Sequence, residues 1–179
     1  PRLMCMTRMN TFEPGATITV APIKTFPIIR DLVTDVSFNF EKAKSIPAFK
    51  PKPKEADGTR RMFQEDIDRV QEFRKCIECF LCQDVCHVLR EHHLQEEFIG
   101  PRHLVHIAAL EMHPLDIEDR VDDLKKTNGI GFCNITKCCT TVCPEEIKIT
   151  DNAIIPLKER IADRFYDPVK RLFRFLFSK

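Results

Sequence analysis

The chain carries a closely spaced run of four cysteines whose spacing is typical of iron–sulfur ligation. The run reads Cys76-Ile-Glu-Cys79-Phe-Leu-Cys82-Gln-Asp-Val-Cys86, which is the pattern C-x2-C-x2-C-x3-C. Three thiolates at three-residue intervals can wrap three corners of a cuboidal cluster. The fourth lies one helical turn further on, so it points away and is available to a neighbouring cluster. The spacing therefore predicts cubane-type ligation.

A second cysteine run repeats this spacing with one ligand replaced. It reads Cys133-Asn-Ile-Thr136-Lys-Cys138-Cys139-Thr-Thr-Val-Cys143-Pro144, and from Cys133 onward it is C-x2-T-x2-C-x3-C-P. Thr136 stands where the first run has its second cysteine. A cuboidal cluster that lacks a thiolate at one corner readily loses the iron there, so we predict a [3Fe–4S] cluster.

Pairing the two runs crosswise assigns the cysteines to two clusters. The four thiolates predicted for a [4Fe–4S] cluster are Cys76, Cys79, Cys82 and Cys143. The three thiolates predicted for the [3Fe–4S] cluster are Cys86, Cys133 and Cys139. Cys138 is then surplus, and we expect a buried free thiol, because two adjacent cysteines rarely reach one small cluster without strain. The alternative is that Cys138 completes a second four-iron cluster.

Zinc is the alternative metal for such a cysteine set. Zinc sites favour C-x2-C pairs in tetrahedral groups of four ligands, sometimes with His, and His87 follows Cys86. Two three-residue steps and one four-residue step, present twice, suit cuboidal clusters better. The nine cysteines are odd in number and clustered, which favours metal ligation in a reducing compartment over a disulfide framework.

The composition argues against several other classes of protein. The 179 residues contain 28 Lys and Arg against 27 Asp and Glu, so a dedicated nucleic-acid binder, which carries a basic excess, is not expected. No run approaches the roughly 18 apolar residues that span a bilayer. The first residues lack the apolar core of a signal peptide. Because the chain begins with Pro1 and not Met, we expect processing or a missing N-terminal part.

The segments that position the cysteines divide at a proline-rich stretch. Between residues 45 and 54 three prolines alternate with three lysines, which predicts an extended, solvated connector and a domain boundary. A surface loop within one domain is the alternative. Before the connector, alternating residues predict a strand over 16–21, and an apolar stripe predicts a helix over 25–43.

Helical signals dominate after the connector. Gly100-Pro101 opens one helix, residues 116–127 form another that stops at Gly129, and Thr150-Asp151 can cap a third that Pro156 can kink. A last helix starts at Asp167-Pro168, and its apolar stripe suits either docking at a membrane surface or packing on a core. The stripe consists of Val169, Leu172, Phe173, Leu176 and Phe177.

These segments together resemble the iron–sulfur subunit of the succinate dehydrogenase/fumarate reductase family. The resemblance covers nearly the whole chain, including both cysteine runs with their crosswise pairing and Gly100-Pro101 between them. Other quinone-linked dehydrogenases share the cluster motifs. The segment Phe26-Pro27-Ile28-Ile29-Arg30-Asp31-Leu32-Val33 narrows the match to this family.

The resemblance implies an α+β fold in four parts. Residues 1–44 would be the C-terminal remnant of a β-grasp [2Fe–2S] ferredoxin domain, and 45–60 a Pro/Lys-rich linker. Residues 61–166 would form an all-α ferredoxin domain with two cuboidal clusters, and 167–179 an amphipathic C-terminal helix. Cys5 matches the last of the family's four [2Fe–2S] ligands, and its three partners are absent from this chain.

The resemblance also implies a function in electron transfer. In the family a flavoprotein subunit oxidises succinate at FAD, and electrons pass through [2Fe–2S], [4Fe–4S] and [3Fe–4S] clusters to quinone at the membrane anchor. This chain would bind neither succinate nor flavin covalently and would hold no catalytic residue. It would lie on the cytoplasmic or mitochondrial-matrix face of the membrane. Nothing in it decides between succinate oxidation and fumarate reduction.

The quinone end departs from the family pattern. Family members place a Trp shortly after the cysteine that matches Cys86, and this chain contains no Trp. We hypothesise that His87 and Asn134 supply polar contacts near the quinone headgroup; the alternative is that they hydrogen-bond cluster sulfurs or backbone. The five later histidines, from His92 to His113, are expected on solvated helix faces. Two other functions stay open: the cluster subunit of another quinone-linked dehydrogenase, and a zinc-binding or redox-sensing module.

Overall fold

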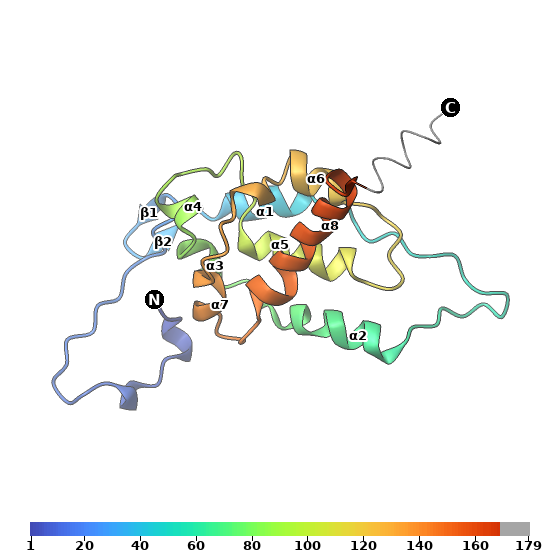
Figure 1. Ribbon diagram of the computed structural model, residues 1–179. Coiled ribbons are helices and arrows are strands. Elements are labelled where there is room, and N and C mark those ends of the chain that lie inside the picture. The colour runs from blue at the N-terminus through green and yellow to red at the C-terminus, as the bar shows by residue number, and fades with distance from the viewer. Residues whose placement is uncertain (169–179) are drawn as a thin grey trace.

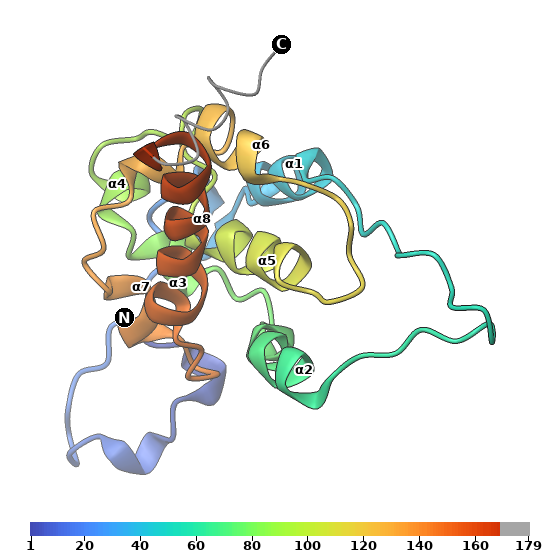
Figure 2. The ribbon, with the colours of Figure 1, turned by 45° about the vertical axis from the view of Figure 1, so that its right-hand side comes forward.

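The structure is a computed structural model in which residues 1–168 are described. Short helices gather around two longer ones, α5 (Pro101–Glu111) and α8 (Ile155–Phe165). The N-terminal segment and the connector extend from this body as loops on opposite sides (Figures 1 and 2). The expected C-terminal helix falls almost wholly outside the described residues. None of the helices within residues 1–168 is long and apolar enough to cross a membrane.

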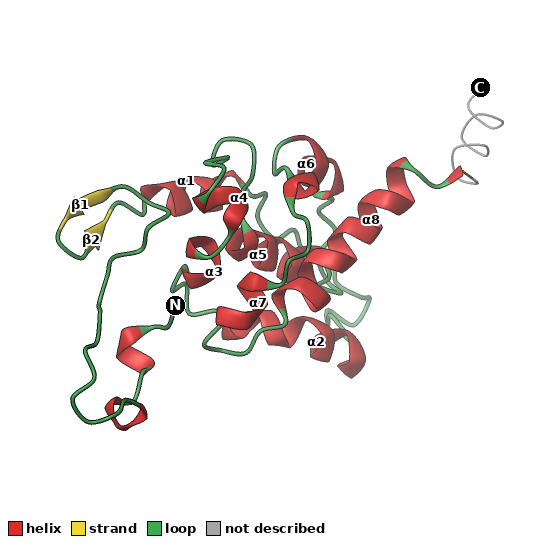
Figure 3. Ribbon diagram, turned by 60° about the vertical axis from the view of Figure 1, so that its left-hand side comes forward, coloured by secondary structure: helices red, strands yellow, loops and turns green. Residues whose placement is uncertain are grey.

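The N-terminal part contains a small antiparallel hairpin followed by one helix (Figure 3). Strand β1 (Ile28–Arg30) pairs with β2 (Val33–Thr34), and α1 (Ser37–Ser45) follows. Two 3-10 turns, Met4–Met6 and Met9–Thr11, precede the hairpin.

Two expectations for this part are wrong. Residues 16–21 run without regular secondary structure, because no second strand lies beside them to take up their backbone hydrogen bonds. Residues 28–34 form the hairpin and not the first half of a helix. β-branched residues favour extended backbone, and Asp31, with φ +50°, turns the chain between the strands. The apolar stripe was misleading, since Ile29 is 67% exposed.

The rest of the chain is helical. In chain order its elements are α2 (Gln64–Gln71), a 3-10 turn (Glu72–Lys75), α3 (Leu81–Asp84), α4 (His87–Arg90), α5, α6 (Val121–Lys126), a 3-10 turn (Ile130–Phe132), α7 (Cys138–Val142), a π-helical turn (Ile149–Ile154) and α8. The described chain is therefore mainly helical, with one two-stranded sheet near its N-terminus.

The helix starts predicted from Gly and Pro agree with the structure better than the other boundaries. Pro101 opens α5 and Gly100 has φ +86°, and a Cβ on Gly100 would lie 2.0 Å from the Gln83 Oε1 atom. Pro156 is the second residue of α8, and the π-helical turn Ile149–Ile154 directly precedes it. The helix expected over 116–127 begins only at Val121, because the preceding residues contact the connector.

The connector is fixed to the helical body over its first half. The guanidinium of Arg120 is fully buried, donates hydrogen bonds to the carbonyls of Pro47 and Ala48, and pairs with Asp116 at 2.9 Å. The Lys52 amide donates to the Leu115 carbonyl at 2.8 Å. Only Ile46 and Pro47 are covered, and residues 48–63 are exposed, so the expected solvated connector is found from residue 48 onward, with its first part hydrogen-bonded to the body.

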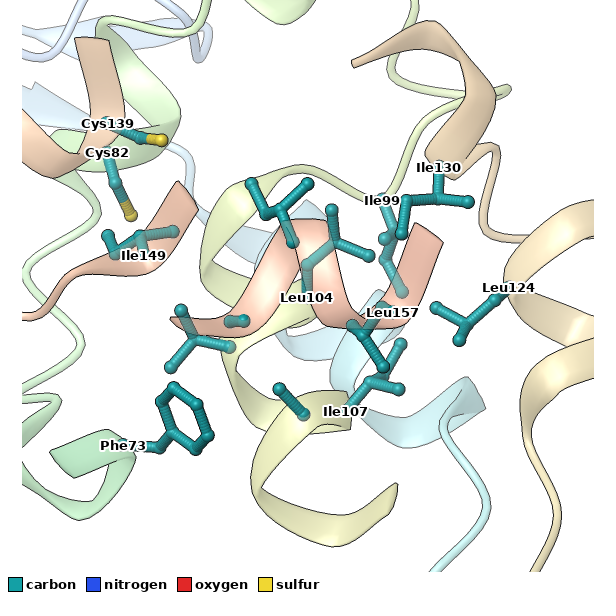
Figure 4. Packing of buried hydrophobic residues seen from close by; sticks show 14 of the residues in the cluster. Phe73, Cys82, Ile99, Leu104, Ile107, Leu124, Ile130, Cys139, Ile149 and Leu157 are labelled. Atoms are coloured by element: carbon teal, nitrogen blue, oxygen red, sulfur yellow. The ribbon is translucent and has the colours of Figure 1, made fainter. Parts of the chain in front are cut away.

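The core lies between α5, the π-helical turn and α8. Leu104, Ile107 and Leu157 are fully buried there, and Leu124 of α6 closes one side (Figure 4). Cys82 and Cys139 lie at one edge of the same cluster, beside Ile149 (Figure 4). The core thus supports the cysteine loops directly.

Candidate functional site

Three cysteines of the first run and one of the second line the same cavity. They are Cys76, Cys79, Cys82 and Cys143. Cys76 ends the 3-10 turn Glu72–Lys75, Cys82 lies on α3, and Cys143 ends α7. Apolar side chains from α5 and the stretch 147–149 close the cavity, so its walls exclude water from most sides.

A second cavity is lined by the remaining clustered cysteines. These are Cys86, Cys133, Cys138 and Cys139, and Thr136 lies among them. Its other walls include Phe98, Pro101 and Ile154. Helices α3 and α7 pack against each other between the two cysteine loops (Figures 1 and 3), so the two cavities are neighbours.

The two loops have the same unusual backbone. Cys79 lies between Glu78 and Phe80, which have φ of +57° and +59°. Thr136 likewise lies between Ile135 and Lys137, with φ of +62° and +61°. Left-handed conformations at non-glycine residues are uncommon and cost free energy, so they persist where the surrounding structure requires them. The second loop therefore keeps the shape of a cluster-binding loop at the position where its thiolate is replaced.

Cys138 is not the buried thiol that was expected. Its side chain is half-buried, lines the second cavity, and lies 3.3 Å from the Thr136 hydroxyl in a hydrogen bond between Sγ and Oγ1. Adjacent residues on the first turn of α7 can both reach the cavity lining, which the expectation of strain did not allow for. Cys139 is the buried one, and its Sγ contacts the Thr150 hydroxyl at 3.5 Å.

Burial makes several of these thiols reluctant to ionise. Burial raises the pKa of Cys79 and Cys139, raises that of Cys82 well above its usual value, and raises that of Cys86 to about 11. Neighbouring thiols raise these pKa values further, because ionised sulfurs would repel one another. A bound iron–sulfur cluster takes thiolates, so its assembly here would displace these protons.

The donor set suits a cluster. Within residues 1–168 no three His, Cys, Asp or Glu side chains converge on a single-ion site. The thiols line two hollows in sets of four, with a mostly apolar lining. Several soft thiolates gathered at one place are the ligands of cuboidal iron–sulfur clusters.

The other candidate residues from the sequence differ in whether they lie at a cysteine cavity. His87 and Asn134 both line the second cavity. Cys5 is exposed on the turn Met4–Met6, and the lining of neither cysteine cavity includes it. The expectation of solvated histidines is wrong for His103, which is fully buried against Phe38 at a ring-centroid distance of 6.4 Å.

Two residues beside the cavities were not anticipated from the sequence. Arg102 lines the first cavity, and Thr150 lines the second. Arg102 directly follows the Gly100-Pro101 helix start, which fixes its place on the first turn of α5. The cysteine spacing does not show which cavity that turn faces, so the position of Arg102 beside the first cavity could be seen only in the structure.

The family model of a 4Fe-4S dicluster domain matches residues 72–147, which contain both cysteine runs. A "fumarate reductase iron-sulfur subunit" of Mycobacterium tuberculosis (strain CDC 1551 / Oshkosh) is 33% identical over 158 residues, covering 82% of this chain and 60% of that protein. A "succinate dehydrogenase iron-sulfur subunit" of Bacillus subtilis (strain 168) is 28% identical over 159 residues, covering 84% and 59%. The chain thus spans about 60% of the length of these curated relatives.

A solved structure gives the same result at higher similarity. One chain of the "Mycobacterium smegmatis Sdh1 complex in the apo form" superposes with a TM-score of 0.89 and 63% sequence identity, covering 94% of this chain and 71% of that one. The mainly helical part is accordingly a ferredoxin-like domain of the 4Fe–4S type. The chain belongs to the family of succinate dehydrogenase and fumarate reductase iron–sulfur subunits.

Proposed function

We propose that this chain is the electron-transfer subunit of a succinate:quinone oxidoreductase. It would pass electrons from an FAD-containing flavoprotein subunit towards quinone at a membrane-anchor subunit. The observation that carries the proposal is the sorting of eight cysteines into two adjacent cavities, four in each, with Thr136 also among the lining residues of the second. Succinate and flavin would bind to the partner subunit, so no residue here has a catalytic role.

Seven cysteines would be ligands in this proposal. The [4Fe–4S] ligands are Cys76, Cys79, Cys82 and Cys143, and the [3Fe–4S] ligands are Cys86, Cys133 and Cys139. When bound, the clusters supply one-electron redox chemistry over a wide range of potential. The chain supplies the left-handed loops that hold the thiols apart, apolar walls that exclude water, and nearby hydroxyl and cationic groups.

The packing of α3 on α7 supports an electron path between the two centres. Cys82 on α3 and Cys139 on α7 lie at one edge of the same apolar core (Figure 4). Their thiols are close enough that a charge on Cys139 raises the pKa of Cys82. The two ligand sets would therefore be neighbours with no polar layer of solvent between them.

The first 44 residues would complete a third site with chain that lies outside this sequence. In this proposal they are the end of a β-grasp [2Fe–2S] domain, Cys5 is one ligand of that cluster, and 45–60 is the linker to the domain over 61–166. The exposed apolar hairpin supports this, since Ile28, Ile29 and Val33 face solvent and would be covered by the remainder of such a domain.

The second cavity would be the quinone end. His87 and Asn134, which line it, would supply polar contacts near the headgroup. The chain would be peripheral on the cytoplasmic or matrix face of the membrane. Fumarate reduction is the alternative direction, favoured by the name of the M. tuberculosis relative.

Low-temperature EPR of the anaerobically purified complex, first oxidised and then reduced with dithionite, tests the proposal. We expect a [3Fe–4S] signal in the oxidised state and cubane signals in the reduced state. Thr136→Cys restores the fourth thiolate, so the oxidised signal should fall by roughly tenfold or more while a second reduced-state cubane signal appears. Thr141→Cys, on the exposed side of α7, is the matched control and should change neither signal.

Two results would contradict the proposal. EPR silence in both states together with bound zinc would exclude electron transfer, because zinc is d¹⁰ and diamagnetic. Cubane signals alone in the unaltered protein would mean that Cys138 completes a four-iron cluster. That result would favour another quinone-linked dehydrogenase.

A further inference from the structure

One cationic side chain lies against the first cavity. Among the described residues that line it, Arg102 is the one cation, and Glu145 is the one anion. The Arg102 side chain is only 9% exposed, although arginine is normally a surface residue. It reaches this place from the first turn of α5, where the Gly100-Pro101 start fixes the backbone. A buried cation at a thiolate-lined cavity needs an explanation in terms of charge.

The hydrogen bonds of this guanidinium are incomplete. Its Nη2 group donates to the Glu78 carboxylate, whose side chain is 52% exposed at the outer edge of the loop between Cys76 and Cys79. Its Nε–H is buried and has no acceptor among residues 1–168. A buried donor without an acceptor costs free energy, so an acceptor at the cavity would complete the group. Sulfur ligands around a cluster are acceptors of this kind.

The second cavity has no such group. The cation that lines it is Lys137, which is 54% exposed and pairs with Asp151 at 2.7 Å. Solvent and the partner carboxylate screen that charge. The buried position of Arg102 therefore distinguishes the first cavity electrostatically from the second.

We propose that Arg102 sets the reduction potential of the first centre and that Glu78 opposes it. This inference rests on the proposed function. Four thiolates make the centre anionic. Reduction adds one electron, supplied by the upstream redox partner, and so makes the centre more negative by one charge. A buried cation stabilises the reduced form more than the oxidised form, and a nearby carboxylate does the opposite. Neither residue is a ligand, so each acts on the centre through its charge.

The two residues make opposite predictions although they form one ion pair. In an EPR-monitored redox titration of the complex, Arg102→Gln should lower the potential of the first centre. Glu78→Gln should raise it. We expect the Arg102 variant to change the equilibrium constant for reduction by about tenfold, which is about 59 mV for one electron, and the Glu78 variant by less, because Glu78 is more exposed. Arg102→Lys keeps the charge and should recover most of the shift.

The opposite signs separate a charge effect from a structural one. Both Gln variants break the same ion pair, so a purely structural role would shift the potential in the same direction in both, or in neither. Either result would overturn the inference. Arg74→Gln is the matched control, because Arg74 is exposed and lines an outer hollow beside Arg102. It should cause a much smaller shift.

The proposed function and this inference fail in different ways. Without a [4Fe–4S] signal in the unaltered complex, the proposed function fails. With that signal present, unshifted or like-signed potentials in the variants overturn only the role of Arg102. If Arg102→Gln loses the cluster, Arg102→Lys and Glu78→Gln still test the inference. An unchanged potential in Glu78→Gln contradicts it.

Discussion

The two cysteine loops share a backbone and differ in chemistry. In each loop a central residue, Cys79 or Thr136, lies between two left-handed residues, and a short helix follows, α3 or α7. The same backbone therefore occurs with a cysteine and with a threonine at the centre of the loop. We infer that the loop conformation does not depend on the central side chain, and that this side chain would set the number of ligands.

The two cavities also differ in the polar residues that line them. The first is closed by apolar side chains and by the buried guanidinium of Arg102. The second is lined by several polar groups, including the hydroxyls of Thr136 and Thr150 and the side chains of His87 and Asn134. We therefore expect two centres of different potential in neighbouring sites.

The largest effect should come from removing a thiol at the first cavity. Cys82 is buried at the edge of the core, so Cys82→Ser leaves a harder, weakly acidic ligand where the cluster needs a thiolate. We expect the [4Fe–4S] signal to fall by at least roughly tenfold, because losing a ligand should weaken cluster binding more than losing a residue that hydrogen-bonds a ligand. EPR spin quantitation and iron analysis measure the loss.

Cys138→Ser is the matched substitution at the second cavity. If the surplus thiol is not a ligand, both EPR signals should survive with their integrated intensities unchanged. Loss of the second cluster in this variant would instead make Cys138 a ligand, and the contrast between a four-thiolate and a three-thiolate site would disappear.

The grouping of the cysteines follows from their spacing, because a three-residue step in a tight loop limits where the next thiol can lie. Their ligation stays a prediction. Spacing could not show the walls, since Arg102 and Thr150 reach the cavities from α5 and the π-helical turn. Those contacts depend on how helices distant in the chain pack.

Local signals predicted the fold unevenly. Gly100 and Pro101 marked the start of α5 correctly, since their allowed backbone angles leave few alternatives. The apolar stripe predicted one helix over 25–43, of which only residues 37–43 are helical, because the apolar residues of an exposed hairpin before them fit the helical period by chance. The burial of His103 was also missed, since a histidine on a helix gives no sequence sign of which way its neighbours pack.

Acid should weaken both cavities together, because one helix start separates them. Pro101 lines the second cavity and Arg102 the first, and the next residue, His103, is buried with neither ring nitrogen hydrogen-bonded within residues 1–168. Burial lowers the pKa of His103 to about 3 from its usual 6.5. The unfolded chain therefore binds a proton that the folded chain excludes. The resulting stability is present above pH 6.5 and is lost as pH falls towards 3, by at most about 1.4 kcal/mol per pH unit.

The complex should thus lose both EPR signals in parallel during incubation between pH 6 and 4, in steps of about one unit. His103→Leu removes the titrating group, so its stability should depend less steeply on pH. His92→Gln, at an exposed position, is the control and should follow the unaltered protein. A pH dependence that is equal in the His103 variant, or loss of one cluster well before the other, would contradict this account.

The smallest effect should be confined to the second centre. The Thr150 hydroxyl contacts Cys139 Sγ at 3.5 Å and accepts a hydrogen bond from the Thr140 hydroxyl at 3.0 Å. Thr150→Val keeps the shape and removes the hydrogen bond to the sulfur, which is worth about 0.5–1.5 kcal/mol. Because the reduced centre is the more electron-rich, its potential should fall, by no more than about 60 mV.

A redox titration that follows both signals measures this shift and its location. The first centre should keep its potential, since Thr150 lines only the second of the two cysteine cavities, and Thr141→Val on the exposed side of α7 should change neither. If the first centre moved as much as the second, the two cavities would be coupled through α7 rather than tuned by their own walls. The Thr150 hydroxyl would then affect the potentials of both centres, and the potential of each centre would not be set by the residues that line its own cavity.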